Sequence, residues 1–477
     1  MTRAGALLCV VCALGEACAA KLCGDISADT VLRRGEAHSL ACLTRVRAPA
    51  TLTIEAGVTI IASNQHTEGV PQMETRLYGI GALIVERGAR LVAEGTASEP
   101  ITFTARFASP GSAEHGLWGG IALLGRAPVQ DRSYLFPGLK NPLSAHDSDY
   151  DVLVRSEYGG DDADDNSGSL RYVRLWHGGH TIDDKSGKEK AHLRLGGLTL
   201  AGVGSATTIE HVEVAHCTND AFALYGGTAH VRRLSALFPR GGDAFVVDAG
   251  YRGRGQYLFG MLGGHGHHGF VVASGNARSR LGTGSGEGRD AQPRSHPEWF
   301  GVTLIGGGVA AEKSTDHSVK LQEGAGGKLG DMVVAHFALP FEVRNCGTEG
   351  HVRTFGEWPA SDYLYVSPRA ILWNAGIGIA QGKTPYGDAT VVLDQTCTTD
   401  TDVLRLSIVD PGLASADASC LEASCLVASA DALPISSGEV STADATFDPR
   451  PTETGPACAA SKDDPSKLDS FFEARRR

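Results

Sequence analysis

Apolar and polar residues alternate along this chain in short runs that fit β-strands, and glycine-rich turns separate the runs. One short motif occurs three times. It consists of a polar residue, a small residue and an apolar run that begins with phenylalanine. The copies occupy residues 219–224, 242–247 and 268–272. Their phenylalanines, Phe222, Phe245 and Phe270, are 23 and then 25 residues apart. A repeat of this length, built from strands and turns, predicts a β-solenoid in which strands one coil apart pair in parallel. We therefore expect an all-β fold, a right-handed parallel β-helix with a single core column containing the three phenylalanines.

The winding pattern divides the chain into segments. A solenoid explains how 477 residues can share one continuous core, because each coil buries its apolar side against its neighbours. We expect the β-helix to span residues 50–392. Residues 21–49 show no clear period and are predicted to form an N-terminal cap, since an end coil would otherwise expose unpaired backbone groups. In residues 393–477 the period fades, which predicts a loop-rich C-terminal extension tied by disulfides.

The first twenty residues have the pattern of a signal peptide. Arg3 supplies a positive charge, residues 4–14 are apolar, and small residues follow at 17–19, so cleavage after Ala19 or Ala20 is expected. A buried N-terminal helix is the alternative. No later run approaches the about 18 apolar residues that a transmembrane helix needs. The mature chain is therefore expected to be secreted, either extracellular or held at the cell surface.

The cysteine count supports export. Eleven cysteines are present, and the three at positions 9, 12 and 18 would leave with the signal peptide. The remaining even number favours disulfides in an oxidising compartment. Cys23 and Cys42 are expected to staple the N-terminal segment, whereas Cys217 and Cys346 are candidates for free buried thiols. The C-terminal extension would be tied by Cys397, Cys420, Cys425 and Cys458, although spacing alone fixes none of these pairings.

Several short phrases between residues 40 and 350 also carry a family resemblance. They include residues 116–121 (GLWGGI), 157–161 (EYGGD), 197–204 (GLTLAGVG) and 219–222 (NDAF). Together they resemble a family of exported bacterial right-handed parallel β-helix proteins of unknown function, which are often labelled lipoproteins. The resemblance implies the fold and export, and it implies no catalytic residues. The chain departs from the lipoprotein pattern because Glu16 places a charge where the lipobox needs a small residue.

An acidic loop is the candidate cation site. Asp161, Asp162, Asp164 and Asn166 lie within six positions, and the last three alternate as the hard oxygen ligands of Ca²⁺ do. The bidentate Glu that ends an EF-hand loop is missing, so a solvated acidic turn is the alternative. Ca²⁺ is the one cofactor that the sequence predicts.

Two histidine groups are candidates for transition-metal sites. One contains His177 and His180, and the other runs from His265 to His268. Neither has an Asp or Cys partner fixed by its spacing, and the surrounding glycines indicate turns. We therefore expect these imidazoles to stack along a turn ladder.

The repeated phrase contains a candidate catalytic row. Equivalent positions in stacked coils lie about 4.8 Å apart, so Asp220, Asp243 and His268 should line up on one side of the solenoid. The row resembles the polygalacturonase arrangement, in which Asn-Thr-Asp, Asp-Asp and Gly-His-Gly motifs follow one another coil by coil. The corresponding residues here read TND at 218–220, GD at 242–243, HHG at 267–269 and SVK at 318–320. One carboxylate and one arginine of that pattern are absent. The alternative is that an Asp two residues before an inward Phe is simply a favourable turn residue.

These observations favour a non-catalytic scaffold that binds an extended polysaccharide or another cell-surface component. The alternative is a polysaccharide-degrading enzyme, a polygalacturonase-like glycoside hydrolase that uses Asp220 and Asp243, or a polysaccharide lyase. The formal charge of −12 gives no reason to expect a nucleic-acid partner.

Overall fold

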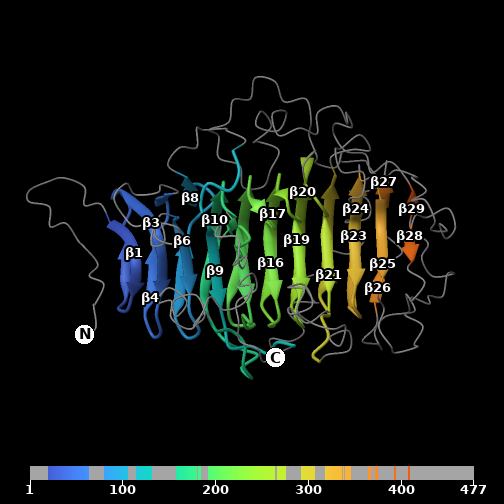
Figure 1. The fold of residues 1–477 in the computed structure, drawn as a ribbon, viewed down its shortest axis with the longest axis horizontal. Helices are drawn as coiled ribbons and strands as arrows, with labels where there is room; N and C mark the ends of the chain where they lie inside the picture. Colours follow the sequence, from blue (N-terminus) through green and yellow to red (C-terminus); the bar gives the residue numbers. More distant parts are fainter. Residues whose placement is uncertain are drawn as a thin grey trace, which may run out of the picture.

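The protein is seen in a computed structural model that describes most of the chain up to residue 344. The described residues are 20–63, 80–105, 114–130, 157–179, 181–183, 192–263, 266–274, 292–306, 317–335, 337, 339–344, 364–366, 371–373, 391–393 and 407–408. Their regular elements are all β-strands, which stand side by side along the long axis of the molecule (Figure 1). Within these residues no helix is long and apolar enough to cross a membrane.

The strands form three parallel faces, and the first is built from short strands. Face one begins with the last residues of β1 (Ala20–Ile26) and β3 (His38–Val46). It continues through β6 (Ala82–Val85), β9 (Gly120–Leu124), β13 (Leu198–Ala201), β16 (Phe222–Tyr225), β19 (Phe245–Asp248), β21 (Phe270–Ala273), β23 (His317–Gln322), β25 (Leu339–Arg344) and β28 (Val391–Leu393). Every one of these pairings is parallel, as a solenoid requires.

Faces two and three share a set of long strands that bend between them. The shared strands are β10 (Gly168–Trp176), β14 (Thr208–Ala215), β17 (His230–Leu237), β20 (Arg254–Met261), β22 (Glu298–Ile305) and β24 (Gly327–Ala335). Face two adds β2 (Thr30–Leu32), β4 (Thr51–Ile54), β7 (Arg90–Glu94) and β26 (Leu364–Val366). Face three adds β5 (Thr59–Ala62), β8 (Ile101–Ala105), β27 (Ile371–Trp373) and β29 (Ser407–Ile408).

Two small pairings lie outside the three faces. β11 (Thr181–Asp183) and β12 (His192–Arg194) form an antiparallel hairpin between β10 and β13. β15 (Thr218–Asn219) and β18 (Arg240–Gly241) pair in parallel just before face one begins in their coils. The predicted all-β, right-handed parallel β-helix is confirmed, since parallel crossovers of this kind are right-handed.

The three repeated phenylalanines share one register in face one. Phe222 pairs with Phe245, and Phe245 pairs with Phe270. All three side chains are buried, and the rings of Phe222 and Phe245 stack with centroids 5.4 Å apart. Trp299 from face two completes the column, because its ring stacks on Phe270 at 4.3 Å and meets Phe245 edge-on. The predicted interior column is therefore confirmed, with a tryptophan added from the opposite side.

Residues 21–49 form the first coil of the solenoid and not a separate cap. β1 pairs in parallel with β3, and β3 leads into face three through β5 and into face one through β6. Leu22, Leu40 and Val46 are buried in the same core as the later coils. Parallel pairing therefore begins before residue 50, because coil stacking depends on backbone pairing and inward apolar residues and needs no repeated phrase.

The structure tests the disulfide and free-thiol predictions for the cysteines that lie within the described residues. The Cys23–Cys42 disulfide joins β1 to β3, with the Cα atoms 4.9 Å apart, as expected. Cys217 is a free buried thiol, and burial raises its pKa, so it stays protonated at neutral pH. The predicted signal peptide up to residue 19 lies outside the described residues, as do Cys346, Cys397, Cys420, Cys425 and Cys458.

The parallel winding continues past its predicted end. β28 pairs with β25, and β29 pairs with β27, so coil pairings reach Ile408 and not residue 392. The rest of the predicted extension, residues 394–406 and 409–477, lies outside the described residues.

The interior column generates a stability prediction. Phe245 is fully buried between Phe222 and Trp299, so replacing Phe245 by Ala removes contacts in two neighbouring coils. We expect Phe245→Ala to lower the free energy of unfolding by about 3–5 kcal/mol, measured by guanidinium denaturation. Ile61→Ala on β5 is the matched control, since that side chain is 43% exposed. A similar loss in both variants would contradict the role assigned to the column.

Candidate functional site

The predicted row of polar residues forms at the start of the strands in face one. Asp220 and Asp243 each lie two residues before a phenylalanine of the column, and the Asp243 main-chain N–H donates to Asp220 Oδ1 at 3.0 Å. One coil further, the His268 main-chain N–H donates to Asp243 Oδ1 at 2.9 Å. The three predicted site residues are therefore neighbours in consecutive coils. Whether they have a catalytic role stays a prediction.

The structure extends this row by a residue that the sequence analysis missed. His317 follows His268 in the next coil, and their rings stack with centroids 5.6 Å apart and nearly parallel. Its position could have been found by aligning Val319 with Phe270, because these two residues pair in the register of face one. His317 Nε2 lies 3.8 Å from Glu342 Oε2, which ends the row in a buried carboxylate.

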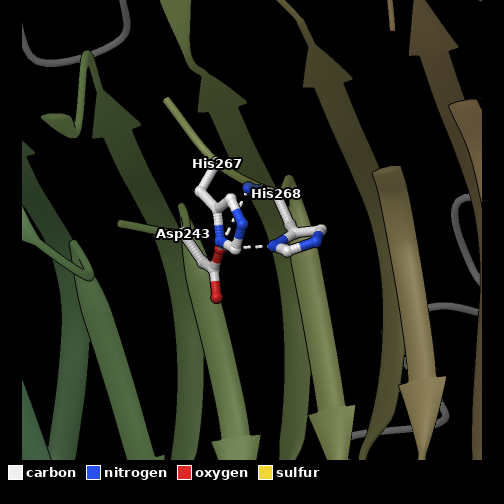
Figure 2. A group of neighbouring side chains, drawn as sticks. All are labelled: Asp243, His267 and His268. Atoms are coloured by element: carbon white, nitrogen blue, oxygen red, sulfur yellow. Dashed lines mark hydrogen bonds and ion pairs between the residues drawn. The ribbon is translucent and has the colours of Figure 1, made fainter. Parts of the chain in front are cut away.

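His267, which the sequence analysis grouped with His268 as a possible metal site, converges with it on the same carboxylate. The Nδ1 atom of His267 lies 3.1 Å from Asp243 Oδ1, and the Nδ1 atom of His268 lies 2.8 Å from it. Figure 2 shows one oxygen of Asp243 against both imidazoles while the other points away. An ionised carboxylate only accepts hydrogen bonds, so each imidazole carries its proton on Nδ1. This Asp243–His267–His268 cluster is the candidate site.

The electrostatics of the cluster favour a negative carboxylate beside a neutral imidazole. Burial alone would raise the pKa of Asp243, but the hydrogen bonds from His267 and His268 outweigh burial and hold that pKa well below its usual range. Burial lowers the pKa of His268, and its hydrogen bond to Asp243 opposes that shift only in part. Asp243 is thus ionised at neutral pH, and it has no proton to give to a leaving group.

A second candidate surface follows the corner where the long strands bend from face two to face three. Tyr172, His211, Arg233 and Tyr257 occupy this corner in successive coils, each with φ between 49° and 59°. The strand register skips each of them, so they stand out from the sheet at the bend. We call these four residues the corner ridge. The sequence signal is a polar residue, the corner residue and an aliphatic residue, as in RYV, EHV, RRL and QYL.

The ridge presents flat side chains in contact with one another. The rings of Tyr172 and His211 stack at 4.2 Å, and the guanidinium of Arg233 lies 5.5 Å from the Tyr257 ring centroid. Glu210 anchors Arg233 through a 2.7 Å hydrogen bond. The next corner residue is Gly301, where a Cβ atom would come within 3.1 Å of the Tyr257 ring. Because Gly301 has no side chain, Tyr257 stays 39% exposed.

The acidic loop is described, and its oxygens take part in turn contacts. Asp161, Asp162 and Asp164 are exposed, and Asn166 is half-buried. Asp162 Oδ1 accepts from the Asp164 main-chain N–H, Asn166 Oδ1 accepts from that of Gly168, and Asp164 Oδ1 accepts from the Ser205 hydroxyl. Each oxygen keeps a further lone pair, so calcium binding stays a prediction. Among the described residues, the His, Cys, Asp and Glu ligand atoms that gather within 4.8 Å belong to Asp243, His267 and His268.

Calcium at the acidic loop is tested by thermal unfolding. We expect Ca²⁺ to raise the melting temperature and EGTA to reverse the shift, since a ligand that binds the folded state stabilises it. Asp164→Asn should remove most of the shift, and Glu94→Gln, an exposed carboxylate on β7, should leave it unchanged. An identical midpoint with and without Ca²⁺ in the unaltered protein would eliminate the site.

His177, from the other histidine group, lies in a ladder of stacked rings at one turn. The rings of His177 and His216 stack at 5.5 Å, and His216 stacks on Phe238 at 5.4 Å. All three residues have positive φ, and they occupy one corner in successive coils. Burial lowers the pKa of His216 to about 3, with further lowering by His177 and His115. His180 and His265 lie outside the described residues.

The ladder makes stability depend on pH. The folded-state pKa of His216 is depressed, so its contribution is complete above the unfolded value of about 6.5 and is lost as the pH falls from there towards 3. We expect His216→Phe, which continues the stack with Phe238, to reduce the loss of unfolding free energy between pH 7 and pH 5 by about 1–2 kcal/mol. Urea denaturation at both pH values measures the difference. Equal losses in the two proteins would contradict the assignment.

Comparison with known proteins gives one family match, which extends over many coils of the solenoid. Residues 24–359 match a family model described as a pectate-lyase-like β-helix domain. No curated protein matches the chain. The matched range begins in β1, so it supports the inclusion of residues 21–49 in the solenoid. The matched range also contains the Asp243–His267–His268 cluster and the corner ridge.

Proposed function

Because the chain belongs to the family of pectate-lyase-like β-helix domains, we propose that it is a secreted or cell-surface scaffold that binds an extended polysaccharide without cleaving it. A domain of this family fits a polysaccharide-related role. The fold and the Cys23–Cys42 disulfide are compatible with an extracellular location. The observation that carries the proposal is the corner ridge, with Tyr257 left open at its end.

The ridge has the chemistry of a polysaccharide surface. Aromatic faces pack against the C–H faces of sugar rings, while guanidinium, imidazole and phenol groups bond to hydroxyls. The ridge supplies one flat side chain per coil along the axis, so a linear polymer meets a new contact at each step. By contrast, the outer side of face one is covered near the column, because Val246 and Val271 are 0% and 2% exposed.

The local charge favours an anionic polysaccharide. Arg171, Arg232 and Arg233 all act on the imidazole of His211 and help burial to lower its pKa, and Glu210 opposes them. Three cationic groups therefore surround one carboxylate on a chain whose formal charge is −12. Arg171 is 47% exposed, so a carboxylate on a uronate sugar can reach it.

The state of Asp243 disfavours it as the acid of an inverting glycosidase. An inverting glycosidase needs one protonated carboxyl to donate to the leaving oxygen. Asp243 accepts three N–H groups on one oxygen, and its pKa is held low by two of them, which favours the ionised form. Asp220 Oδ1 in turn accepts the Asp243 main-chain N–H. The alternative, hydrolysis by Asp220 and Asp243, is kept as an outcome of the test.

The test is a binding titration with polygalacturonate and with a neutral glucan, combined with an assay for released reducing ends. We expect the protein to bind the anionic polymer, more weakly at high salt, and to release no reducing ends. Tyr257→Ala should weaken binding by about fivefold or more, as expected for a side chain worth about 1 kcal/mol. Ile61→Ala is the control, because it also removes an exposed hydrophobic side chain, on β5.

Two results would overturn the proposal. Unchanged affinity in Tyr257→Ala would show that the ridge is not the binding surface. Release of reducing ends by the unaltered protein, lost in Asp243→Asn, would establish the hydrolytic alternative.

A further inference from the structure

We propose that Asp243, His267 and His268 form a binding site for one divalent transition-metal ion, with Zn²⁺ as the best-matched ion. The inference is independent of polysaccharide binding. The three residues lie at the start of β19 and β21 in face one, whereas the ridge lies where faces two and three meet.

The distances between donor atoms suit a shared ion. The Nδ1 atoms of His267 and His268 lie 3.1 Å and 2.8 Å from Asp243 Oδ1, and the three ligand atoms all fall within 4.8 Å of one another. Ligands about 2.0–2.2 Å from a zinc ion are separated from each other by about 3 Å. For an ion to bind, each imidazole exchanges its proton with solvent from Nδ1 to Nε2, so that the neutral ring offers a Nδ1 lone pair to the ion.

The donor types select the class of ion. Two imidazoles and one carboxylate suit Zn²⁺ and its first-row neighbours, whereas Ca²⁺ takes six to eight oxygen ligands. Three protein ligands leave at least one position for water, as in open zinc sites. Asp243 contributes a carboxylate oxygen that accepts three N–H groups in the absence of an ion.

The surrounding residues hold the ligands in place. The main-chain N–H of Asp243 is fixed by Asp220, and the ring of His268 is stacked on His317. Such outer contacts orient metal ligands and reduce the cost of ordering them on binding. Lys320 is a cationic group that acts on His268, and its ammonium lies 3.7 Å from Glu342 Oε2.

Solvent reaches the cluster from one side. The His267 side chain is 42% exposed, while those of Asp243 and His268 are 11% and 4% exposed. An ion can therefore enter past His267 and meet two ligands that are already buried. Because His267 is the exposed member, its loss should change metal binding with little effect on folding.

The test is zinc titration of the purified protein after chelator treatment, followed by calorimetry and by the melting temperature. We expect one equivalent of Zn²⁺ to bind and to raise the midpoint, and any Ca²⁺ heat to be the same in His267→Ala as in the unaltered protein. His267→Ala should weaken zinc binding by more than about tenfold. His230→Ala, the same change at a half-buried histidine on face two, should bind as the unaltered protein does.

Cobalt provides a signal that a purely structural cluster would not give. Co²⁺ bound by two imidazoles and a carboxylate absorbs visible light, and this absorption should be lost in His267→Ala and in Asp243→Asn. Circular dichroism establishes that each variant is folded. The proposal is overturned if the unaltered protein binds no Zn²⁺ near one equivalent, or if folded His267→Ala binds it equally well.

Discussion

In-register parallel stacking of successive coils is the constraint on which the rest of this structure depends. Each face-one strand pairs with its counterpart one coil away, so Phe222, Phe245 and Phe270 fall in line. The same register places the residues two positions earlier in line, which brings Asp220, Asp243 and His268 together. A one-residue slip would reverse inward and outward side chains, and it would disperse both the apolar column and the polar row.

The corners show what the stacking can impose on individual residues. Tyr172, His211, Arg233 and Tyr257 adopt positive φ, a conformation that costs about 1–3 kcal/mol for residues other than glycine. The strands on both sides of each corner are paired in two faces, so they fix the bend whichever side chain occupies it. The cost is offset by ring stacking and cation–π contacts between neighbouring coils. Backbone strain and surface chemistry are therefore properties of the corner ridge as a whole and not of one residue.

Sequence reasoning found the parts of the molecule in which the same type of side chain recurs in successive coils. The phenylalanine spacing predicted the fold and the row containing Asp220 and Asp243. The corner ridge was missed because its members share a backbone conformation and not a chemical type. His267 was named in a histidine group, but its carboxylate partner was not found, because only the turn geometry brings its Nδ1 onto the same oxygen as that of His268. The first coil was missed because its strands carry no repeated phrase.

The state of Asp243 links the chemistry of the row to its architecture. A catalytic acid must exchange a proton with its substrate, which requires a pKa near the working pH. Stacked main-chain and imidazole N–H groups instead surround this carboxylate and stabilise its negative form. The negative charge that keeps it from donating a proton is the charge that a cation needs, and the two Nδ1 lone pairs face that carboxylate once each imidazole carries its proton on Nε2. The register of the solenoid thus places a carboxylate among fixed nitrogen atoms, and this arrangement is the basis of the proposed ion site.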